Sequence, residues 1–210
     1  MSTAGGDLPA GTEPLLAQLE RARDLGLLGP GPAVDHLVHA QAFIDALAGL
    51  TGRVVDLGSG GGVPGLPVAI ARPDLEVVLL DAAARRGAFL TSAVEALGIS
   101  DRVSVVTGRA EDLGRGELRG TAAAVLARSF GPPSATAECG APLLRLGGRL
   151  IVSEPPHAGD RWPLAGTKLF GLVPLGSAQG TPKIQVLEQR SPCPDTYPRR
   201  DGVPAKRPLF

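Results

Sequence analysis

The feature that most constrains this chain is a run of glycines between a short apolar segment and a proline. Residues 54–67 read Val-Val-Asp-Leu-Gly-Ser-Gly-Gly-Gly-Val-Pro-Gly-Leu-Pro. The apolar residues at 54–57 are typical of a buried strand, and Pro64 is typical of the first turn of a helix. The glycines between them allow positive φ angles and leave room for a ligand beside the free N–H groups at the helix start. The pattern predicts a ligand-binding turn, with a tight structural turn as the alternative.

Short apolar runs alternate with helical patterns through the middle of the chain. The expected strands are 54–57, 76–80, 103–107, 122–127 and 149–153, and the expected helices are about 64–71, 83–97 and 134–144. Strands that are apolar on both faces and separated by helices are typical of a parallel sheet built from βαβ units. We therefore expect an α/β protein with a mostly parallel twisted sheet flanked by helices.

The chain is expected to divide into three regions. They are an N-terminal helical extension (1–52, with helices from Thr12 and over about 33–50), a main domain (53–190) and a basic tail rich in proline and arginine (191–210). Inside the main domain, 168–174 and 184–188 are expected to pair as a closing antiparallel hairpin. The tail is expected to be irregular.

The composition narrows the class of protein. The 210 residues suffice for one domain with its own core, and 21 basic residues balance 21 acidic ones, which argues against indiscriminate attraction of nucleic acid. Cys139 and Cys193 lie in unrelated contexts, so no disulfide framework or metal site is expected and both thiols are interpreted as structural. No secretory signal and no membrane-spanning run is visible. We expect a cytoplasmic monomer without a metal or membrane partner.

Acidic residues at or after the ends of the first three strands indicate which ligand the turn binds. Asp56 precedes the first glycine, and an anionic side chain suits an ammonium group better than a pyrophosphate. Asp81 ends the second strand 21 residues after Gly60, where an acid accepts hydrogen bonds from ribose hydroxyls; a helix N-cap is its alternative role. Glu111 and Asp112 follow the third strand, where an acid faces an adenine amino group or stays a solvated loop carboxylate. These positions favour S-adenosylmethionine, which has no phosphate.

Several segments, in order along the chain, resemble one bacterial enzyme family. Residues 56–67 resemble the D-x-G-[ST]-G-x-G-x-P-G-[IL]-P signature of the small-subunit ribosomal RNA methyltransferase G family, formerly called glucose-inhibited division protein B. Further similar segments are Arg72-Pro73, Leu79-Leu80-Asp81, Arg85-Arg86 with Phe89-Leu90, Arg109-Ala110-Glu111, Ala127-Arg128-Ser129-Phe130 and the tail from Tyr197 to Lys206. The resemblance covers about residues 53–154 and part of the tail.

The resemblance implies a Rossmann-like class I S-adenosylmethionine-dependent methyltransferase that acts on N7 of a guanine in 16S rRNA. Its partner would be 16S rRNA or the 30S subunit. Carried over residue by residue, the cofactor contacts fall on Gly58, Val63, Ala110, Glu111 and Arg128, with Asp81 on the ribose. Asp56 and Gly60 complete the expected cofactor-binding set. His39 resembles a family histidine of the N-terminal helical region, with satisfied packing as its alternative role.

Methylation at guanine N7 suits the residues of this chain. N7 is a lone pair without a proton, so the enzyme has to position it but needs no general base. Exocyclic amino groups are usually methylated beside an Asp/Asn-Pro-Pro-aromatic loop after the fourth strand, where residues 127–130 read Ala-Arg-Ser-Phe. Arg128 is the candidate catalytic residue, because an arginine that ends a buried strand must face a carboxylate or the substrate. A salt bridge to Glu111 is its structural alternative, and Phe130 either stacks on a flipped base or packs in the core.

Six basic residues are candidates for contact with RNA phosphate, with solvated surface as the alternative: Arg85, Arg86, Arg199, Arg200, Lys206 and Arg207. Two other functions stay open on the residues alone. One is methylation of a small molecule or natural product by an enzyme of the same fold. The other is a non-catalytic, cofactor-binding module associated with the ribosome.

Overall fold

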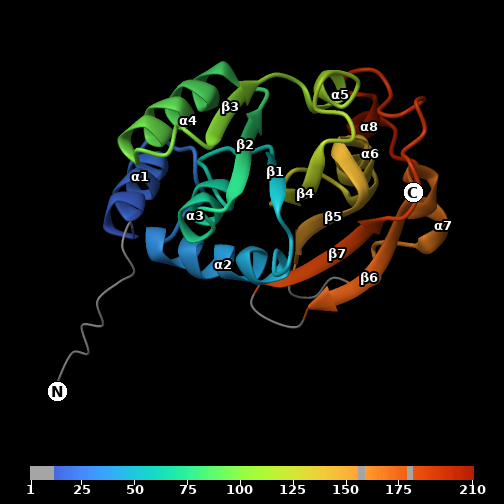
Figure 1. The fold of residues 1–210 in the computed structure, drawn as a ribbon, viewed down its shortest axis with the longest axis horizontal. Coiled ribbons are helices and arrows are strands. Elements are labelled where there is room, and N and C mark those ends of the chain that lie inside the picture. Colours follow the sequence, from blue (N-terminus) through green and yellow to red (C-terminus); the bar gives the residue numbers. More distant parts are fainter. Residues whose placement is uncertain (1–11, 156–158, 179–181) are drawn as a thin grey trace.

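A single seven-stranded sheet runs through the protein, whose computed structural model describes residues 12–155, 159–178 and 182–210. The strand order is β3-β2-β1-β4-β5-β7-β6 (Figure 1). The strands are β1 (Gly52–Leu57), β2 (Leu75–Asp81), β3 (Val103–Thr107), β4 (Ala122–Ala127), β5 (Leu144–Glu154), β6 (Leu172–Ala178) and β7 (Lys183–Gln189). β1 to β5 are parallel, whereas β7 is antiparallel to both β5 and β6.

Helices cover both faces of the sheet (Figure 1). On one face lie α1 (Thr12–Asp24), α2 (Ala33–Ala46), α3 (Gly65–Ala71) and α4 (Ala84–Ala96). On the other lie α5 (Ala110–Leu113), α6 (Pro133–Gly140), α7 (Leu164–Thr167) and α8 (Val203–Lys206), with short 3-10 turns at Ala141–Leu143 and Lys168–Phe170. The expected α/β fold class is confirmed.

The sheet separates two apolar cores. Successive residues of a strand point to opposite faces. Val54 of β1 and Val77 of β2 therefore pack on the α1–α4 side, while Val55 and Val78 pack on the α5–α8 side. Because helices cover both sides, these strands are apolar at consecutive positions rather than alternating with polar residues.

Most expected elements are found, but several bounds differ. β5 begins at Leu144 instead of 149, α2 ends at Ala46 instead of near 50, and the tail, expected to be irregular, contains α8. β3 and β4 have the expected bounds, but the expected helix 134–144 stops at Gly140 and continues as a 3-10 turn containing Pro142, which has no N–H to extend an α-helix. The first strand of the expected hairpin was placed too early. Residues 168–170 form a 3-10 turn, Gly171 at φ +80° reverses the chain, and β6 begins only at Leu172.

The tail, residues 191–210, packs on the α5–α8 face instead of extending into solvent (Figure 1). The fully buried carboxylate of Glu138 in α6 accepts hydrogen bonds from the Arg199 guanidinium at 2.7 Å and from the Arg199 backbone N–H at 2.8 Å. Arg119 donates to the carbonyl oxygens of Cys193 and Tyr197 at 2.8 and 2.9 Å. The ring of Tyr197 packs edge-on against Phe170, 4.8 Å between centroids. The tail is therefore held to the main domain by buried contacts.

No helix within the described residues has the length and apolarity needed to cross a membrane. The same described ranges contain no group of three or more His, Cys, Asp or Glu side chains arranged to hold a metal ion.

Candidate functional site

The glycine-rich turn joins the end of β1 to α3 and is fixed to the end of β2. The backbone N–H groups of Gly58 and Ser59 both donate to the carbonyl oxygen of Leu80, at 2.8 and 2.9 Å. Gly58 and Gly60 have φ angles of +75° and +55°, which residues with side chains rarely adopt. The glycines are thus required by the backbone path at the carboxyl edge of the sheet.

Asp81 holds the turn from the neighbouring strand. Its side chain is 3% exposed. Oδ2 accepts a hydrogen bond from the Gly60 N–H and Oδ1 accepts one from the Ala83 N–H, both at 2.9 Å. The Arg86 guanidinium lies 3.5 Å from Oδ2. Ala83, not Asp81, is the N-cap residue of α4, and no side chain caps this helix, so the N-cap role considered for Asp81 is not formed. The carboxylate instead ties the residue before α4 to the glycine turn.

Asp56 lies beneath the turn, fully enclosed. Oδ2 accepts a hydrogen bond from the backbone N–H of Gly65, the first residue of α3, at 3.0 Å. Burial raises the pKa of Asp56 from 3.8 to about 6, although the Ser59 and Gly65 hydrogen bonds and the charge of Arg128 oppose the shift. Val63 is also buried in this turn. Asp56 thus supports the start of α3 from inside.

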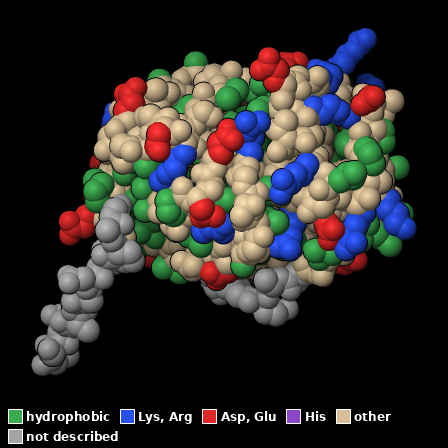
Figure 2. All heavy atoms as spheres, in the orientation of Figure 1, with side chains coloured by type: hydrophobic (Ala, Val, Ile, Leu, Met, Phe, Trp, Pro, Cys, Tyr) green, Lys and Arg blue, Asp and Glu red, His purple; other side chains and the backbone are tan. Residues whose placement is uncertain are grey.

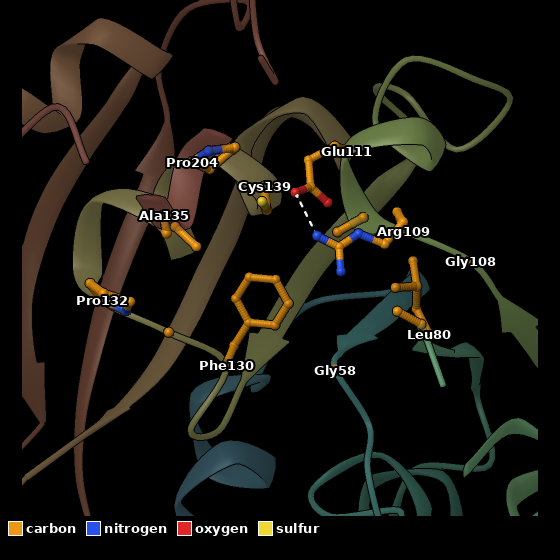
Figure 3. A pocket seen from close by; sticks show the side chains of 14 residues that line it. Gly58, Leu80, Gly108, Arg109, Glu111, Phe130, Pro132, Ala135, Cys139 and Pro204 are labelled. Atoms are coloured by element: carbon orange, nitrogen blue, oxygen red, sulfur yellow. Dashed lines mark hydrogen bonds and ion pairs between the residues drawn. The ribbon is translucent and has the colours of Figure 1, made fainter. Parts of the chain in front are cut away.

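A cavity of about 250 Å³ opens beside the turn (Figure 3). Its lining comprises Gly58, Leu80, Ala82, Gly108, Arg109, Ala110, Glu111, Phe130, Gly131, Pro132, Ala135, Cys139, Pro204 and Ala205. Three of the expected cofactor residues, Gly58, Ala110 and Glu111, are in this lining. The other five expected residues are not in the lining: Asp56, Gly60, Val63, Asp81 and Arg128. Asp81 adjoins the lining in the chain, because Leu80 and Ala82 on either side of it both line the cavity.

The ring of Phe130 faces the open side of Gly58. Figure 3 shows this ring pointing into the cavity between Pro132 and Arg109. A Cβ atom added to Gly58 would lie 2.8 Å from the Phe130 Cδ2 atom, closer than real Cβ contacts. A side chain at position 58 would therefore collide with the Phe130 ring unless that ring moved.

The tail supplies one wall of the cavity, through Pro204 and Ala205. The Glu111 carboxylate accepts hydrogen bonds from the Gly202 N–H at 2.8 Å and from Arg109 at 3.4 Å (Figure 3). Sequence reasoning treated the tail as a separate RNA-binding segment and did not expect it at the cofactor cavity. The resemblance of 197–206 to the family's tail motif is the available signal, because it sets this part of the tail apart from an ordinary basic segment.

Arg128 ends β4 and contacts a histidine. Its Nη1 lies 3.0 Å from Nδ1 of His36. Burial lowers the pKa of Arg128, and the nearby Asp56 charge acts in the opposite direction. The proposed bridge to Glu111 is not formed, and among the residues described no carboxylate lies within 4 Å of the Arg128 guanidinium. Ser129, directly after it, has φ +56°, a strained value that turns the next loop sharply.

Both histidines of α2 lie in this region, but His36 rather than His39 contacts Arg128. Burial, followed by the charge of Arg128, lowers the pKa of both rings, and that of His39 falls to about 4. His39 is therefore neutral at pH 7. In the described part of the chain the Nε2 atoms of both rings are buried without a hydrogen-bond partner.

The six candidate RNA-binding residues occupy different environments. Three exposed or partly exposed guanidinium groups have protein partners: Arg85 donates to the Leu25 carbonyl at 2.8 Å, Arg86 faces Asp81 at 3.5 Å and Arg199 pairs with Glu138 at 2.7 Å. The other three, Arg200, Lys206 and Arg207, are exposed on the tail, next to the Pro204–Ala205 wall.

Neither cysteine is suited to act as a nucleophile. Burial raises the pKa of the Cys139 thiol far above its usual range, and it raises the pKa of Cys193 to about 11. A thiol of this kind stays protonated at neutral pH and is a poor nucleophile. Although Cys139 lines the cavity, the interpretation of both thiols as structural agrees with these environments.

The sheet order and the glycine turn at the carboxyl edge define the class: a Rossmann-like methyltransferase of class I. Two of the solved structures similar to this chain have the same kind of fold. The antibiotic-resistance methyltransferase Kmr has a TM-score of 0.53 at 21% identity, covering 72% of this chain and 93% of Kmr. TYW2 of P. horikoshii, solved in complex with MeSAdo, has a TM-score of 0.58 at 17% identity, covering 79% and 64%.

Residues 33–162 match the family model described as rRNA small subunit methyltransferase G, and the chain belongs to this family. A relative called ribosomal RNA small subunit methyltransferase G in Rubrobacter xylanophilus is 35% identical over 210 residues, covering 93% of this chain and 80% of the relative. One of the same name in Deinococcus radiodurans is 36% identical over 188 residues, covering 80% and 73%. The family resemblance seen in the sequence is confirmed.

Proposed function

We propose that this protein is an S-adenosylmethionine-dependent methyltransferase that methylates N7 of a guanine in 16S rRNA. The observation that carries the proposal is the match to the methyltransferase G family over residues 33–162, a range that contains the glycine turn and most of the lining of the adjoining cavity. The polar groups of the site fit this cofactor. Carboxylates follow β2 and β3, and the glycine floor at Gly58 leaves no room for a side chain.

Four residues would hold the cofactor. Asp81 would accept a hydrogen bond from a ribose hydroxyl through Oδ1, which accepts only the Ala83 N–H among the described residues, whereas Oδ2 accepts the Gly60 N–H and also faces Arg86. Glu111 faces the adenine end of the cavity, and Gly58 provides its floor. Arg128, which has no carboxylate partner among the described residues, would pair with the cofactor carboxylate. When bound, S-adenosylmethionine supplies an electrophilic methyl group on its sulfonium.

Methyl transfer to guanine N7 requires correct positioning of the base and the cofactor but no proton acceptor. Guanine N7 attacks with a lone pair that carries no proton, so the enzyme needs only to bring the two reacting atoms to about 3 Å in line. The Cys139 thiol, which lines the cavity, stays protonated and therefore offers no covalent alternative to direct transfer. The residues of the site exclude water and orient the base instead of exchanging protons.

The exposed tail residues Arg200, Lys206 and Arg207 would contact RNA phosphates at the mouth of the cavity. Figure 2 shows that basic and acidic side chains are intermixed over the face in view. Attraction of RNA would therefore be local, at the cavity, and not spread over the molecule. The substrate would be 16S rRNA or the 30S subunit, met in the cytoplasm by a monomeric enzyme.

Transfer of a labelled methyl group tests the proposal. The purified protein is incubated with labelled S-adenosylmethionine and either bare 16S rRNA or 30S subunits from cells that lack the protein. Incorporation into 16S rRNA, recovered as 7-methylguanosine, is the expected result. Incorporation only into small molecules would favour the natural-product alternative, and cofactor binding without any turnover would favour the non-catalytic one.

A further inference from the structure

A second cavity, of about 370 Å³, lies on the other side of the loop that follows β4. Its walls come from that loop, from the end of β5 and from α2, which contributes His39. Phe130 and Gly131 line both this cavity and the cofactor cavity. The two cavities therefore adjoin one another at these two residues. Its volume lies in the range of pockets that hold small ligands.

A buried carboxylate faces this cavity. The Glu154 side chain, at the end of β5, is 3% exposed. Oε1 accepts a hydrogen bond from the Trp162 indole N–H at 2.8 Å, and Oε2 accepts one from Arg161 at 3.1 Å. A carboxylate has about four lone-pair sites. Among the described residues, Trp162 and Arg161 take two of them, which leaves two lone-pair sites of Glu154 for a ligand.

These two free sites match one nucleobase in particular. Guanine carries adjacent N–H donors, N1–H and the 2-amino group, on its Watson–Crick edge. Adenine and cytosine place an unprotonated ring nitrogen at the corresponding position, which a carboxylate repels, and uracil has one N–H flanked by carbonyl oxygens. Enzymes that modify a base commonly extrude it and read this same edge. Glu154 is therefore complementary to guanine and opposed to the other three bases.

We propose that the second cavity receives the substrate guanine and that Glu154 selects it by accepting hydrogen bonds from N1–H and the 2-amino group. This inference rests on the proposed function and names how the base is chosen. Because N7 belongs to the imidazole ring, on the other side of the purine, this pairing leaves N7 free to be methylated. Phe130, shared by both cavities, is placed to contact the base between them.

Trp162 and Arg161 act as positioning residues in this arrangement. They hold the two Glu154 oxygens and also line the second cavity themselves, and Trp162 is 4% exposed. Each donor therefore fixes the orientation of one oxygen of the Glu154 carboxylate.

Substrate discrimination provides the test. The 16S rRNA is ligated from synthetic segments so that the methylated guanosine is replaced by inosine, which lacks the 2-amino group, or by adenosine. We expect kcat/KM of the wild-type enzyme to fall roughly ten- to hundredfold with inosine, the effect of one lost base-specific contact. The Glu154→Gln enzyme should lose most of its activity on guanosine and show no further loss with inosine. Its affinity for S-adenosylmethionine, measured by calorimetry, should be unchanged.

Glu188→Gln is the matched control, because Glu188 pairs with Arg190 at 2.9 Å on β7, and neither residue is in the lining of the second cavity. It should keep the wild-type preference. If Glu154→Gln fails to fold, the inosine comparison in the wild-type enzyme still decides. Equal rates for guanosine and inosine, or a Glu154→Gln enzyme with the wild-type preference, overturn the inference alone. A wild-type protein that methylates no 16S rRNA overturns the proposed function as well.

Discussion

The backbone N–H of Gly60 donates a hydrogen bond to the Asp81 carboxylate at 2.9 Å, joining the turn after β1 to the end of β2. The other Asp81 oxygen accepts the Ala83 N–H at the same distance. One buried side chain thus fixes two segments that border the cofactor cavity. Oδ1, which accepts the Ala83 N–H, is the oxygen proposed to hold the ribose.

Replacement of Asp81 by Asn should therefore affect both binding and stability. The amide has only one oxygen, so either the Gly60 or the Ala83 N–H loses its acceptor, at a cost of about 1–3 kcal/mol. We expect the dissociation constant for S-adenosylmethionine to rise by about tenfold or more, as judged by calorimetry. Asp74→Asn, an exposed acid paired with Arg72, is the control. Equal cofactor affinities of these two variants would exclude Asp81 from the site.

Two glycines with similar backbone angles allow the effect of backbone strain to be distinguished from the effect of filling the cavity. Gly58 and Gly98 have similar φ angles, +75° and +65°, but a Cβ at Gly58 meets Phe130 whereas nothing lies within 4 Å of one at Gly98. Substitution by Ala should lower the unfolding free energy in both variants by about 1–2 kcal/mol, because each forces a side chain into the left-handed region. Only Gly58→Ala should lose cofactor binding. Retained binding in Gly58→Ala would show that the ligand does not rest on this turn.

The buried pair Glu138–Arg199 predicts that the tail is needed for folding. Arg199→Ala leaves the fully buried Glu138 carboxylate with a single backbone donor, and removing one partner of a buried ion pair typically costs about 3–5 kcal/mol. Arg200→Ala, one residue later and exposed, should unfold like the wild type in urea. If both variants have the wild-type midpoint, the tail is not held by this contact.

Asp56 predicts a pH dependence of stability. The pKa of Asp56 is 3.8 in the unfolded chain and about 6 in the folded protein, so the protonated carboxyl favours the folded state. This contribution to the unfolding free energy is fully present below pH 4 and is lost as the pH rises through 6. Asp56→Asn removes this titration and keeps an acceptor for the Gly65 N–H. Relative to Asp56→Asn, the wild type should gain up to about 3 kcal/mol of unfolding free energy between pH 7 and pH 4. A pH-independent difference between the two proteins would contradict the buried placement of Asp56.

The three exposed tail cations predict a salt effect on RNA binding. Alanine at Arg200, Lys206 and Arg207 together should reduce the slope of log K against log salt by about 2, the value for three phosphate contacts on single-stranded RNA. Folding should be unaffected, because these side chains are exposed. An unchanged slope would place the RNA on another surface.

The sequence predicted the features that depend on local pattern. The parallel sheet followed from consecutive apolar positions in the strands, and the sharp turn at Gly58 followed from the glycine run between a strand and a helix. Contacts between distant segments were not predictable in the same way. Nothing local to Glu111 indicates that the Gly202 N–H, 91 residues away, binds its carboxylate, and nothing local to Arg128 indicates His36 as its partner, 92 residues away.

The same dependence on distant contacts explains why the sequence does not distinguish the roles of the tail arginines. Arg199 and Arg200 are adjacent and chemically identical, yet one is bound to a buried acid and the other is exposed. Charge and composition describe both equally well. Only the position of Glu138 on α6 separates a structural arginine from a candidate RNA contact.

Nucleotide-resolution mass mapping of 16S rRNA tests the central claim most directly. Rather than total incorporation, it compares each guanine in rRNA from cells with the protein, without it, and with the Gly58→Ala variant. The account predicts one 7-methylguanosine that is present with the wild-type protein and absent in the other two samples. An identical set of methylated nucleotides in all three samples would contradict the assignment of this chain as a 16S rRNA methyltransferase.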